Sequence, residues 1–246
     1  MHYEFSENLK RFADADKKVC VLTGAGVSRE SGIPTFRGKD GLWRNYDATQ
    51  LATPEAFAYD PVLVWEWYNW RRGLIKPISP NPGHIAISRM ENHYKDFTLI
   101  TQNVDGLHAK AGNKKILELH GNIWQVRCVK EGTMSENFDY PLDPIPPKCS
   151  CGAMLRPNVV WFGEALNQEI LSEAFQKASK CDLFLIVGTS GIVYPAASIP
   201  YEAKSSGVFI VDVNPEPSNL THIADEFIQG PSGEALPQFL KFLNIP

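Results

Sequence analysis

Four short apolar runs that end in small polar residues constrain the fold of this chain more than any other feature. Helical spacing separates the runs, which predicts an α/β fold with a doubly wound, mostly parallel sheet. The carboxyl ends of parallel strands line one crevice, and such folds bind ligands there. Polar residues can simply terminate strands, but four such endings together favour a nucleotide site. The runs are Val19–Leu22, Phe97–Ile100, Leu183–Val187 and Val208–Val213, and they end at Thr23-Gly24, Gln102-Asn103, Gly188-Thr189-Ser190 and Asn214.

The glycine turn after the first run has two interpretations. Gly24 and Gly26 lead into a segment with helix-start character, where backbone N–H groups can approach a phosphate. The dinucleotide fingerprint requires a third glycine at the position that Arg29 occupies, so this turn departs from it. The residues alone fit a phosphate cradle and an ordinary strand-to-helix turn equally well. The polar loop 31–38 suits a cover over a ligand or an exposed surface loop.

The spacing of the runs predicts two insertions into the sheet domain. Roughly seventy residues separate the first two runs, far more than one crossover helix needs. Thr53-Pro54 and Asp60-Pro61 each begin a helix in this stretch, and the second helix runs to about Lys76. The second insertion spans residues 128–154, which are rich in proline, acidic residues and cysteine.

Size and charge limit the classes of protein to consider. With 246 residues, 43% of them apolar, the chain can bury the core of one large domain with a smaller satellite. A net charge of −4 gives no electrostatic footprint for nucleic acid, so no direct binding to DNA or RNA is expected. No apolar run approaches the length of a membrane span, and the N-terminus lacks a signal-peptide core. We expect a cytoplasmic monomer without membrane contact.

Six motifs follow one another between residues 19 and 232, namely GAGVSRESGIPTFRG, TQNVDGLH, LHG around His120, VVWFGE, GTSGIVYPAA and VNPEP. With these motifs in this order, the chain resembles the sirtuins, the NAD-dependent protein-lysine deacylases. The resemblance implies a Rossmann-type NAD-binding domain, formed by residues 1–38, 81–126 and 155–246. It also implies a small domain, residues 39–80 and 127–154, that combines a helical module with a zinc-type module. Acyl-lysine proteins or peptides, the substrates, would lie between the two domains.

The same resemblance implies the chemistry. The acyl oxygen of a modified lysine attacks the ribose carbon that bears nicotinamide, and the acyl group ends on ADP-ribose. His120 matches the general base, and an imidazole with an ordinary pKa near 6.5 suits that role. Taken alone, His120 would be interpreted as a structural histidine. The other histidines are interpreted in that way, namely His2, His84, His93, His108 and His222.

The family motifs also assign binding residues by position. The residues expected to hold the phosphates and cover the ribose are Gly24, Ala25, Gly26, Ser28, Phe36 and Arg37. The nicotinamide pocket would be lined by Gln102, Asn103 and Asp105, and the adenosine half by Gly188, Thr189, Ser190, Asn214, Glu216 and Ser232. The peptide substrate would add as a strand between Val160, Trp161, Phe162, Gly163 and Glu164 on one side and Gly191 to Tyr194, including Val193, on the other.

Two residues of the predicted helix 61–76 bear on the choice of acyl group. Tyr68 and Arg71 are three positions apart and share a helix face, where a guanidinium and a phenol can hold a carboxylate. This arrangement resembles the class III sirtuins, which remove succinyl and malonyl groups, and Ala52 would leave room for a longer chain. Bacterial-type members also remove acetyl groups, so we expect these activities together. The alternative is that Arg71 only pairs with a surface acid such as Glu66.

The metal site departs from the family pattern. Sirtuins usually carry two cysteine pairs that bind a structural zinc ion. Here Cys128, Cys149 and Cys151 remain, and Glu131 stands at the position of the fourth cysteine. Glu131 can supply an oxygen ligand, or the site can lack metal; we favour zinc.

Two other functions fit the same fold and cofactor. One is a protein ADP-ribosyltransferase, and the other is a non-catalytic binding module that responds to NAD. His120 together with Asn103 and Asp105 argues against the inert module.

Overall fold

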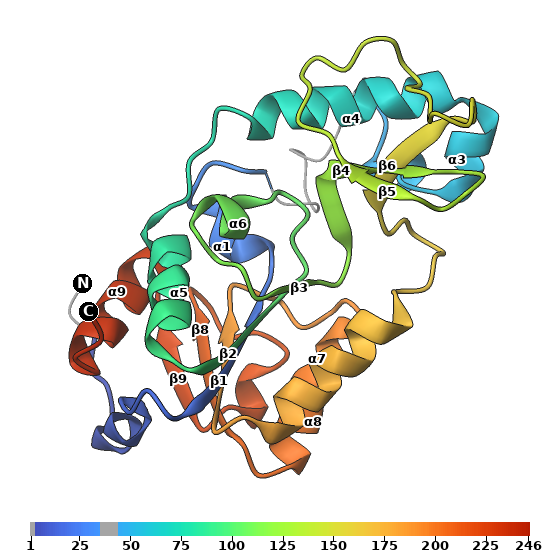
Figure 1. Cartoon of the computed structure of the whole chain (residues 1–246). Helices are drawn as coiled ribbons and strands as arrows, with labels where there is room; N and C mark the ends of the chain where they lie inside the picture. The colour runs from blue at the N-terminus through green and yellow to red at the C-terminus, as the bar shows by residue number, and fades with distance from the viewer. Residues whose placement is uncertain (1–2, 35–43) are drawn as a thin grey trace.

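The computed structural model describes residues 3–34 and 44–246, so the predicted ligands Phe36 and Arg37 lie outside the described residues. Figure 1 shows a large domain built on a sheet and a smaller domain beside it. The main sheet has six parallel strands in the order β3-β2-β1-β7-β8-β9. The predicted parallel, doubly wound sheet is therefore confirmed. Its strands are β1 (Lys18–Thr23), β2 (Asp96–Thr101), β3 (Ile116–Glu118), β7 (Leu183–Val187), β8 (Phe209–Asn214) and β9 (Glu226–Gln229).

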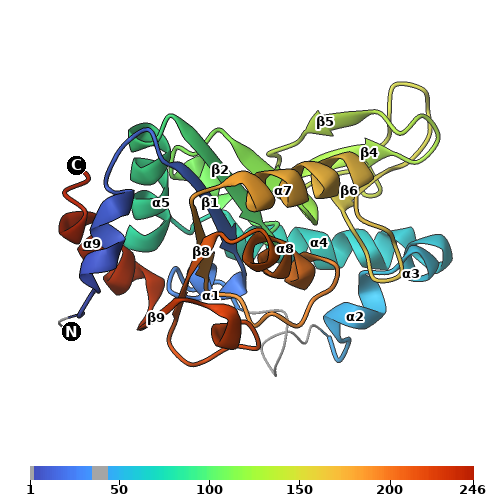
Figure 2. The same cartoon turned by 90° about the horizontal axis from the view of Figure 1, so that it is seen from below.

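Helices cover both faces of this sheet because its strands are apolar on both sides. Val19 and Val21 of β1 belong to the core under α5 (Pro82–His93) and α9 (Ser232–Phe242). The alternate residues Cys20 and Leu22 belong to the core under α7 (Gln168–Lys180) and α8 (Ile199–Ser205). Successive side chains of a strand point to opposite faces, and a parallel sheet buries both. Figures 1 and 2 show the two helical layers on either side of the sheet.

The small domain joins a helical module to a three-stranded antiparallel sheet of order β5-β4-β6. The two predicted helix starts are confirmed, since Thr53 Oγ1 accepts from Ala56 N at 3.0 Å and Asp60 Oδ1 accepts from Leu63 N at 2.9 Å. A third apolar core unites helices and sheet. The predicted domain boundary between residues 126 and 127 falls inside β4. The elements are α2 (Ala48–Leu51), α3 (Pro54–Tyr59), α4 (Pro61–Ile75), β4 (Gly121–Cys128), β5 (Met134–Glu136) and β6 (Leu155–Val159).

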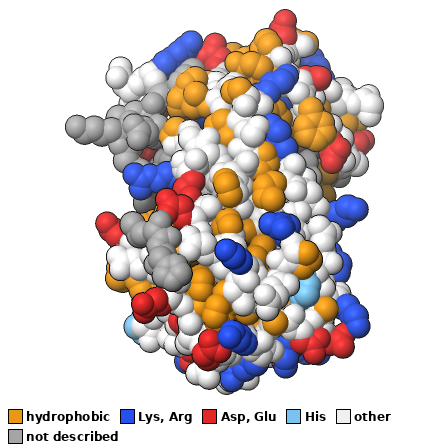
Figure 3. Space-filling view, turned by 90° about the vertical axis from the view of Figure 1, so that its left-hand side faces the viewer, with side chains coloured by type: hydrophobic (Ala, Val, Ile, Leu, Met, Phe, Trp, Pro, Cys, Tyr) orange, Lys and Arg blue, Asp and Glu red, His pale blue; other side chains and the backbone are white. Residues whose placement is uncertain are grey.

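Short helical turns complete the fold. They are the 3₁₀ helices Glu7–Phe12, Ala196–Ser198 and Thr221–Ile223 and the α-helices α1 (Ala25–Arg29) and α6 (Leu107–Lys110). None of the helices in the described ranges has both the length and the apolar character that crossing a bilayer requires. On the face shown in Figure 3, basic and acidic side chains are interspersed.

Candidate active site

The carboxyl ends of four neighbouring strands meet at one edge of the main sheet, as the sequence predicts. Gly24 N, after β1, donates to Val187 O at the end of β7 at 3.1 Å. Gln102, after β2, donates through its side chain to Thr189 Oγ1 at 2.9 Å. Asn214 ends β8 and donates to Thr189 O at 3.5 Å. The polar residues of four strand ends therefore form one continuous hydrogen-bonded edge.

The glycines of the first turn allow two loops to approach closely. A Cβ on Gly24 would lie 2.7 Å from Thr189 Cβ, and one on Gly26 would lie 2.6 Å from Gly188 O. Gly26 N donates to Gly188 O at 2.8 Å, which locks the loops together. Any larger residue at either position would force the loops apart. Only glycine at these two positions therefore permits the close packing of the loop after β1 against the loop after β7.

His120 lies beside this edge, two residues beyond the end of β3. Its Nδ1 is 2.9 Å from Gln102 O, and a carbonyl oxygen can only accept, so Nδ1 carries the proton. The lone pair of the neutral ring is then on Nε2. Burial lowers the pKa of His120, and the hydrogen bond to Gln102 acts in the opposite direction. The ring is therefore a neutral base with its proton-accepting atom fixed.

A second hydrogen-bonded group combines Ser28, Asn103 and Asp105. Ser28 Oγ donates to Asp105 Oδ2 at 2.7 Å and accepts from Asn103 Nδ2 at 3.1 Å. Asp105 Oδ1 accepts from Leu107 N at 2.8 Å, which fixes the carboxylate from its other side. Burial raises the pKa of Asp105, and the bonds from Leu107 and Ser28 oppose this rise. The structure thus brings three predicted cofactor residues together from α1 and the loop after β2.

Two histidines that the sequence analysis interprets as structural lie directly behind this group. His84 Nε2 is 3.4 Å from Ser28 Oγ, and His108 Nε2 is 3.0 Å from Thr23 Oγ1. Their ring centroids are 4.8 Å apart. Burial lowers the pKa of His84 to about 4; burial, together with the His84 charge, lowers that of His108 to about 3. Both rings are therefore neutral at pH 7, and only their three-dimensional proximity to Ser28 distinguishes them from ordinary core histidines.

The residues predicted to bind the adenosine half differ in their exposure and in their hydrogen bonds within the protein. Asn214 Nδ2 donates to the buried carboxylate of Asp212, which also accepts from Thr221 Oγ1 at 2.5 Å. Ser232 is buried, and its hydroxyl donates to Glu30 Oε1 at 2.5 Å. The side chains of Ser190 and Glu216 are exposed. Within the protein, Ser232 therefore fastens the start of α9 to α1.

Tyr68 and Arg71 lie inside the small domain, toward the sheet edge. Tyr68 is fully buried, and its hydroxyl oxygen accepts from Trp161 Nε1 at 2.8 Å. Burial raises the pKa of Tyr68 to about 12, and the Arg71 charge acts against it. Burial lowers the pKa of Arg71, which Tyr68 and Asp105 counteract. Glu66, the alternative partner considered for Arg71, instead accepts from Arg44 Nη1 at 2.7 Å.

The segment expected to pair with a peptide is not extended over its whole length. Strand β6 ends at Val159, and the chain then turns at Phe162 and Gly163, where Gly163 has a φ of +89°. The cause is Glu164, whose N–H donates to Trp161 O at 3.0 Å and whose Oε2 accepts from Trp161 N at 2.8 Å. Phe162 and Val193 nevertheless remain exposed, at 51% and 39%.

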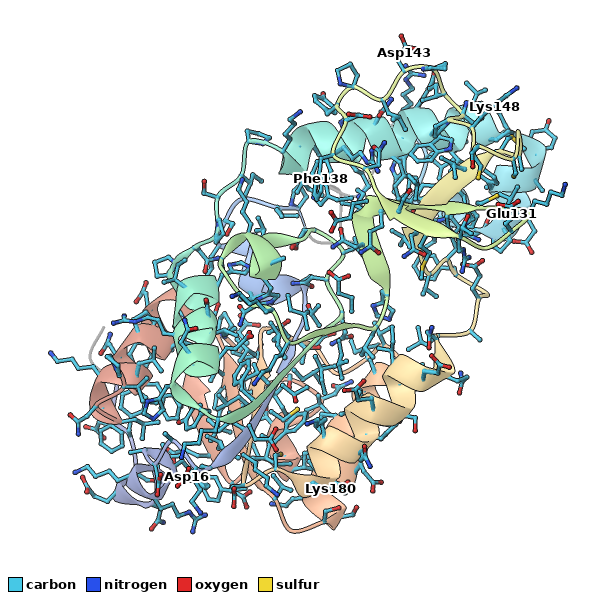
Figure 4. The ribbon with its side chains drawn as sticks, viewed as in Figure 1. Asp16, Glu131, Phe138, Asp143, Lys148 and Lys180 are labelled. Carbon is cyan, nitrogen blue, oxygen red and sulfur yellow. The ribbon has the colours of Figure 1, made fainter. Side chains whose placement is uncertain are left out.

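The predicted metal ligands form a compact cluster with Glu131. Cys128 Sγ lies 3.6 Å from Cys151 Sγ, and Cys149 Sγ lies 4.0 Å from Glu131 Oε2. The four ligand atoms all lie within 4.8 Å of one another. Two sulfurs on one tetrahedral zinc ion, with Zn–S bonds of about 2.3 Å, are separated by roughly 3.8 Å, so the cluster fits zinc. Figure 4 places Glu131 at the end of the small domain remote from the sheet.

Comparisons with known proteins agree with this geometry. A model of the Sir2 family matches residues 24–195 of the chain. An NAD-dependent protein deacylase of Aquifex aeolicus (strain VF5) is 52% identical over 227 residues, which cover 92% of this chain and 95% of that protein.

Solved structures extend the likeness to the fold. The chain is similar to a Sir2 homolog–NAD complex with a TM-score of 0.89 at 43% identity, which covers 99% of this chain and 96% of that one. A Sir2–p53 peptide–NAD+ complex has a TM-score of 0.85 at 30% identity and covers 99% of this chain and 100% of that one.

Proposed function

Because this chain belongs to the Sir2 family and is an NAD-dependent protein deacylase, we propose that its acyl pocket accepts succinyl and malonyl groups besides acetyl. The observation that carries the proposal is the pairing of the Tyr68 hydroxyl and the Arg71 guanidinium on one face of α4, inside the small domain. Both groups can donate hydrogen bonds, and a guanidinium grips a carboxylate with two parallel bonds.

His120 is the group that we propose as the general base. Bound NAD supplies the ribose carbon from which nicotinamide departs. His120 would accept a proton from a ribose hydroxyl at Nε2, because Nδ1 is committed to Gln102 O. Its lowered pKa keeps the ring neutral at pH 7, so it is ready to accept that proton. Ser28, Asn103 and Asp105 would hold the cofactor beside it.

The residues at the carboxyl edge of the main sheet carry polar groups at the ends of the strands. We propose that the glycine turn after β1 holds the phosphates and that Asn214, with Thr189 and Ser190, contacts the adenosine half. Phe162 and Val193, both exposed, would flank a peptide added between the two loops. We further propose that the chain works as a monomer in the cytoplasm and that zinc occupies the cluster around Cys128.

Mass spectrometry of matched peptides tests the acyl assignment. The protein is incubated with NAD and a succinyl-lysine, malonyl-lysine or acetyl-lysine peptide of one sequence. We expect a deacylated peptide and an acyl-ADP-ribose of the corresponding mass in each case. Protein that carries an ADP-ribosyl group, without any acyl-ADP-ribose, would indicate an ADP-ribosyltransferase. The absence of both products would indicate a non-catalytic binding module.

Substitution of Arg71 separates the acyl preference from the chemistry. We expect Arg71→Met to lower the ratio of desuccinylation to deacetylation by roughly 10- to 100-fold, since a hydrogen bond to a charged group contributes about 1.5–3 kcal/mol. Arg89→Met is the matched control, because Arg89 is an exposed residue of α5 in the large domain and donates to Pro246 O at 2.8 Å. An unchanged ratio in Arg71→Met would refute the assignment.

A further inference from the structure

The hydroxyl of Tyr68 is held in one direction by a residue from another part of the chain. Trp161 Nε1 lies 2.8 Å from Tyr68 Oη, and both residues are buried, at 2% and 0% exposure. An indole N–H can only donate, so the phenol oxygen must accept this bond. The phenol hydrogen is therefore directed away from Trp161 and remains available to an acceptor.

The neighbours of Tyr68 determine what kind of acceptor it can meet. The adjacent Arg71 guanidinium has donors and no acceptor, so it cannot take the phenol hydrogen. Among the described residues, Asp105 acts on Arg71 through its charge, and its hydrogen bonds come from Ser28 at 2.7 Å and from Leu107 N at 2.8 Å, with none from Tyr68. The Tyr68 hydroxyl and the Arg71 guanidinium are both donors on one face of α4, so a ligand acceptor beside them would meet both. A carboxylate, with two oxygens and about four lone-pair sites, matches this need.

Trp161 itself is fixed from three sides. The Arg156 guanidinium stacks on its ring, with the carbon 3.4 Å from the ring centroid, and Phe57 packs with a centroid distance of 5.3 Å. Its backbone N–H donates to Glu164 Oε2 at 2.8 Å. The stacked guanidinium is therefore a rigid support for the indole.

Glu164 completes this support. Arg156 donates to both of its carboxylate oxygens, from Nη1 to Oε1 at 2.5 Å and from Nη2 to Oε2 at 2.9 Å. Arg156 is 7% exposed, so this bidentate pair is screened little by solvent. The turn at residues 161–164 and Arg156, near the start of β6, therefore hold the indole N–H in a fixed position.

We propose that Trp161 is a positioning residue for acyl specificity: its indole N–H occupies the Tyr68 oxygen and so directs the phenol hydrogen toward the carboxylate of the acyl group. The inference rests on the proposed desuccinylase function. It adds that the preference depends on β6 and its turn as well as on α4. An acetyl group ends in a methyl and gains nothing from this donor.

The test compares Trp161→Phe with wild type in the paired peptide assay. We expect the ratio of desuccinylation to deacetylation to fall roughly 3- to 10-fold, through a higher KM for the succinyl peptide, as for the loss of one hydrogen bond. Tyr68→Phe should lower the ratio by a similar factor. The double variant should lower it no further, because both changes remove the same oriented phenol donor.

Phe175→Leu is the matched control. Phe175 lies in α7 and packs against a large-domain core, whereas Trp161 and Tyr68 belong to the core of the small domain, so we expect the ratio to stay within twofold of wild type. Should Trp161→Phe lack a cooperative thermal transition, benzothienylalanine at position 161 keeps the bicyclic ring and replaces the N–H by sulfur. An unchanged ratio in either folded variant, or a double variant whose loss equals the product of the single losses, would overturn the proposal.

Arg71→Met in the same assay separates the two levels of inference. If Arg71→Met lowers the ratio and Trp161→Phe does not, the desuccinylase assignment stands and the role of Trp161 is refuted. If neither changes it, or wild type does not remove succinyl groups, both proposals fail.

Discussion

The two sides of the candidate site differ in how far backbone bonds hold them together. On the large-domain side, backbone bonds join the strand ends in addition to side-chain bonds: Gln102 N donates to Thr23 O at 3.0 Å, and Gly26 N donates to Gly188 O at 2.8 Å. On the small-domain side, side chains join distant segments. Trp65 Nε1 donates to Leu155 O at 2.9 Å, and Arg72 Nη2 donates to Ile123 O at 2.7 Å.

This difference determines whether a substitution affects catalysis alone or also the stability of the fold. A side chain at the sheet edge can be replaced without loss of the backbone bonds that hold the edge together. A buried side chain of the small domain often supports the fold and the acyl pocket at once. We therefore expect substitution of a half-buried side chain at the sheet edge, such as His120, to change turnover at nearly constant stability, and substitutions on the second side to change stability or acyl preference.

The strongest test of the large-domain side is His120→Ala. We expect deacylation to fall at least about 100-fold for every acyl group, since general-base catalysis contributes about 10²–10⁴-fold. The midpoint of thermal unfolding should remain close to wild type. Deacylated peptide is measured by mass spectrometry, with His93→Gln as control, because His93 is the last residue of α5 and its ring nitrogen lies 2.9 Å from Ala13 O. Full activity in folded His120→Ala would remove the basis for the mechanism.

Arg72→Met tests the small-domain side. Arg72 is fully buried and donates to Ile123 O and, at 2.6 Å, to Asn137 Oδ1, and its loss leaves these acceptors unpaired. We expect unfolding free energy to fall by about 3 kcal/mol, measured by urea denaturation. Arg11→Met, on an exposed turn of the large domain, serves as comparison. A small-domain variant as stable as wild type would break the contrast between the two sides.

The buried histidines sharpen the comparison through pH. The pKa of His84 is about 4 in the folded protein and near 6.5 in the unfolded chain. The contribution of the neutral ring to the free energy of unfolding is therefore fully present above pH 6.5 and is lost as the pH falls toward 4. We expect His84→Gln to remove about 2 kcal/mol of the stability difference between pH 7 and pH 4.5. Urea midpoints of both proteins across this range measure it. Parallel pH profiles would show that this ring does not titrate on unfolding as inferred.

The metal cluster is expected to give the smallest effect. A thiolate binds zinc more readily than a carboxylate, so Glu131→Cys should hold zinc against roughly tenfold more chelator than wild type. Elemental analysis after dialysis against a chelator series measures the ratio of zinc to protein. Ser150→Ala is the control, because Ser150 Oγ lies 3.8 Å from Cys149 Sγ without being an expected ligand. Wild-type protein that retains no zinc at any chelator concentration would contradict zinc binding.

The sequence predicts the large-domain side better than the small-domain side. Apolar runs are local signals, so the parallel sheet of the large domain follows from them. In the small domain only the helix caps at Thr53 and Asp60 follow from such local signals. Strand β9 (Glu226–Gln229) is short and partly polar, and no local signal distinguishes it. The bond from Trp161 to Tyr68 spans 93 positions, and no spacing rule connects them.

A single sequence does not distinguish a side chain that binds a ligand from one that binds another part of the protein. Glu164 and Ser232 occupy family motifs, but their side chains bind Arg156 and Glu30 within the protein. His84 and His108 match ordinary core histidines by composition and acquire their place near Ser28 only when α5 and α6 pack together. Such assignments depend on tertiary contacts, which a single sequence does not contain.

Helix α4 has two roles carried by neighbouring residues. Tyr68 and Arg71 are the residues that we propose to bind the acyl group, while Arg72 anchors the helix to β4 through Ile123 O. A designer could therefore exchange positions 68 and 71 and leave position 72 untouched. Substitutions at these two positions would then change which acyl-lysine the enzyme accepts. A variant library limited to positions 68 and 71 would be small and could yield enzymes for acyl groups with other terminal groups.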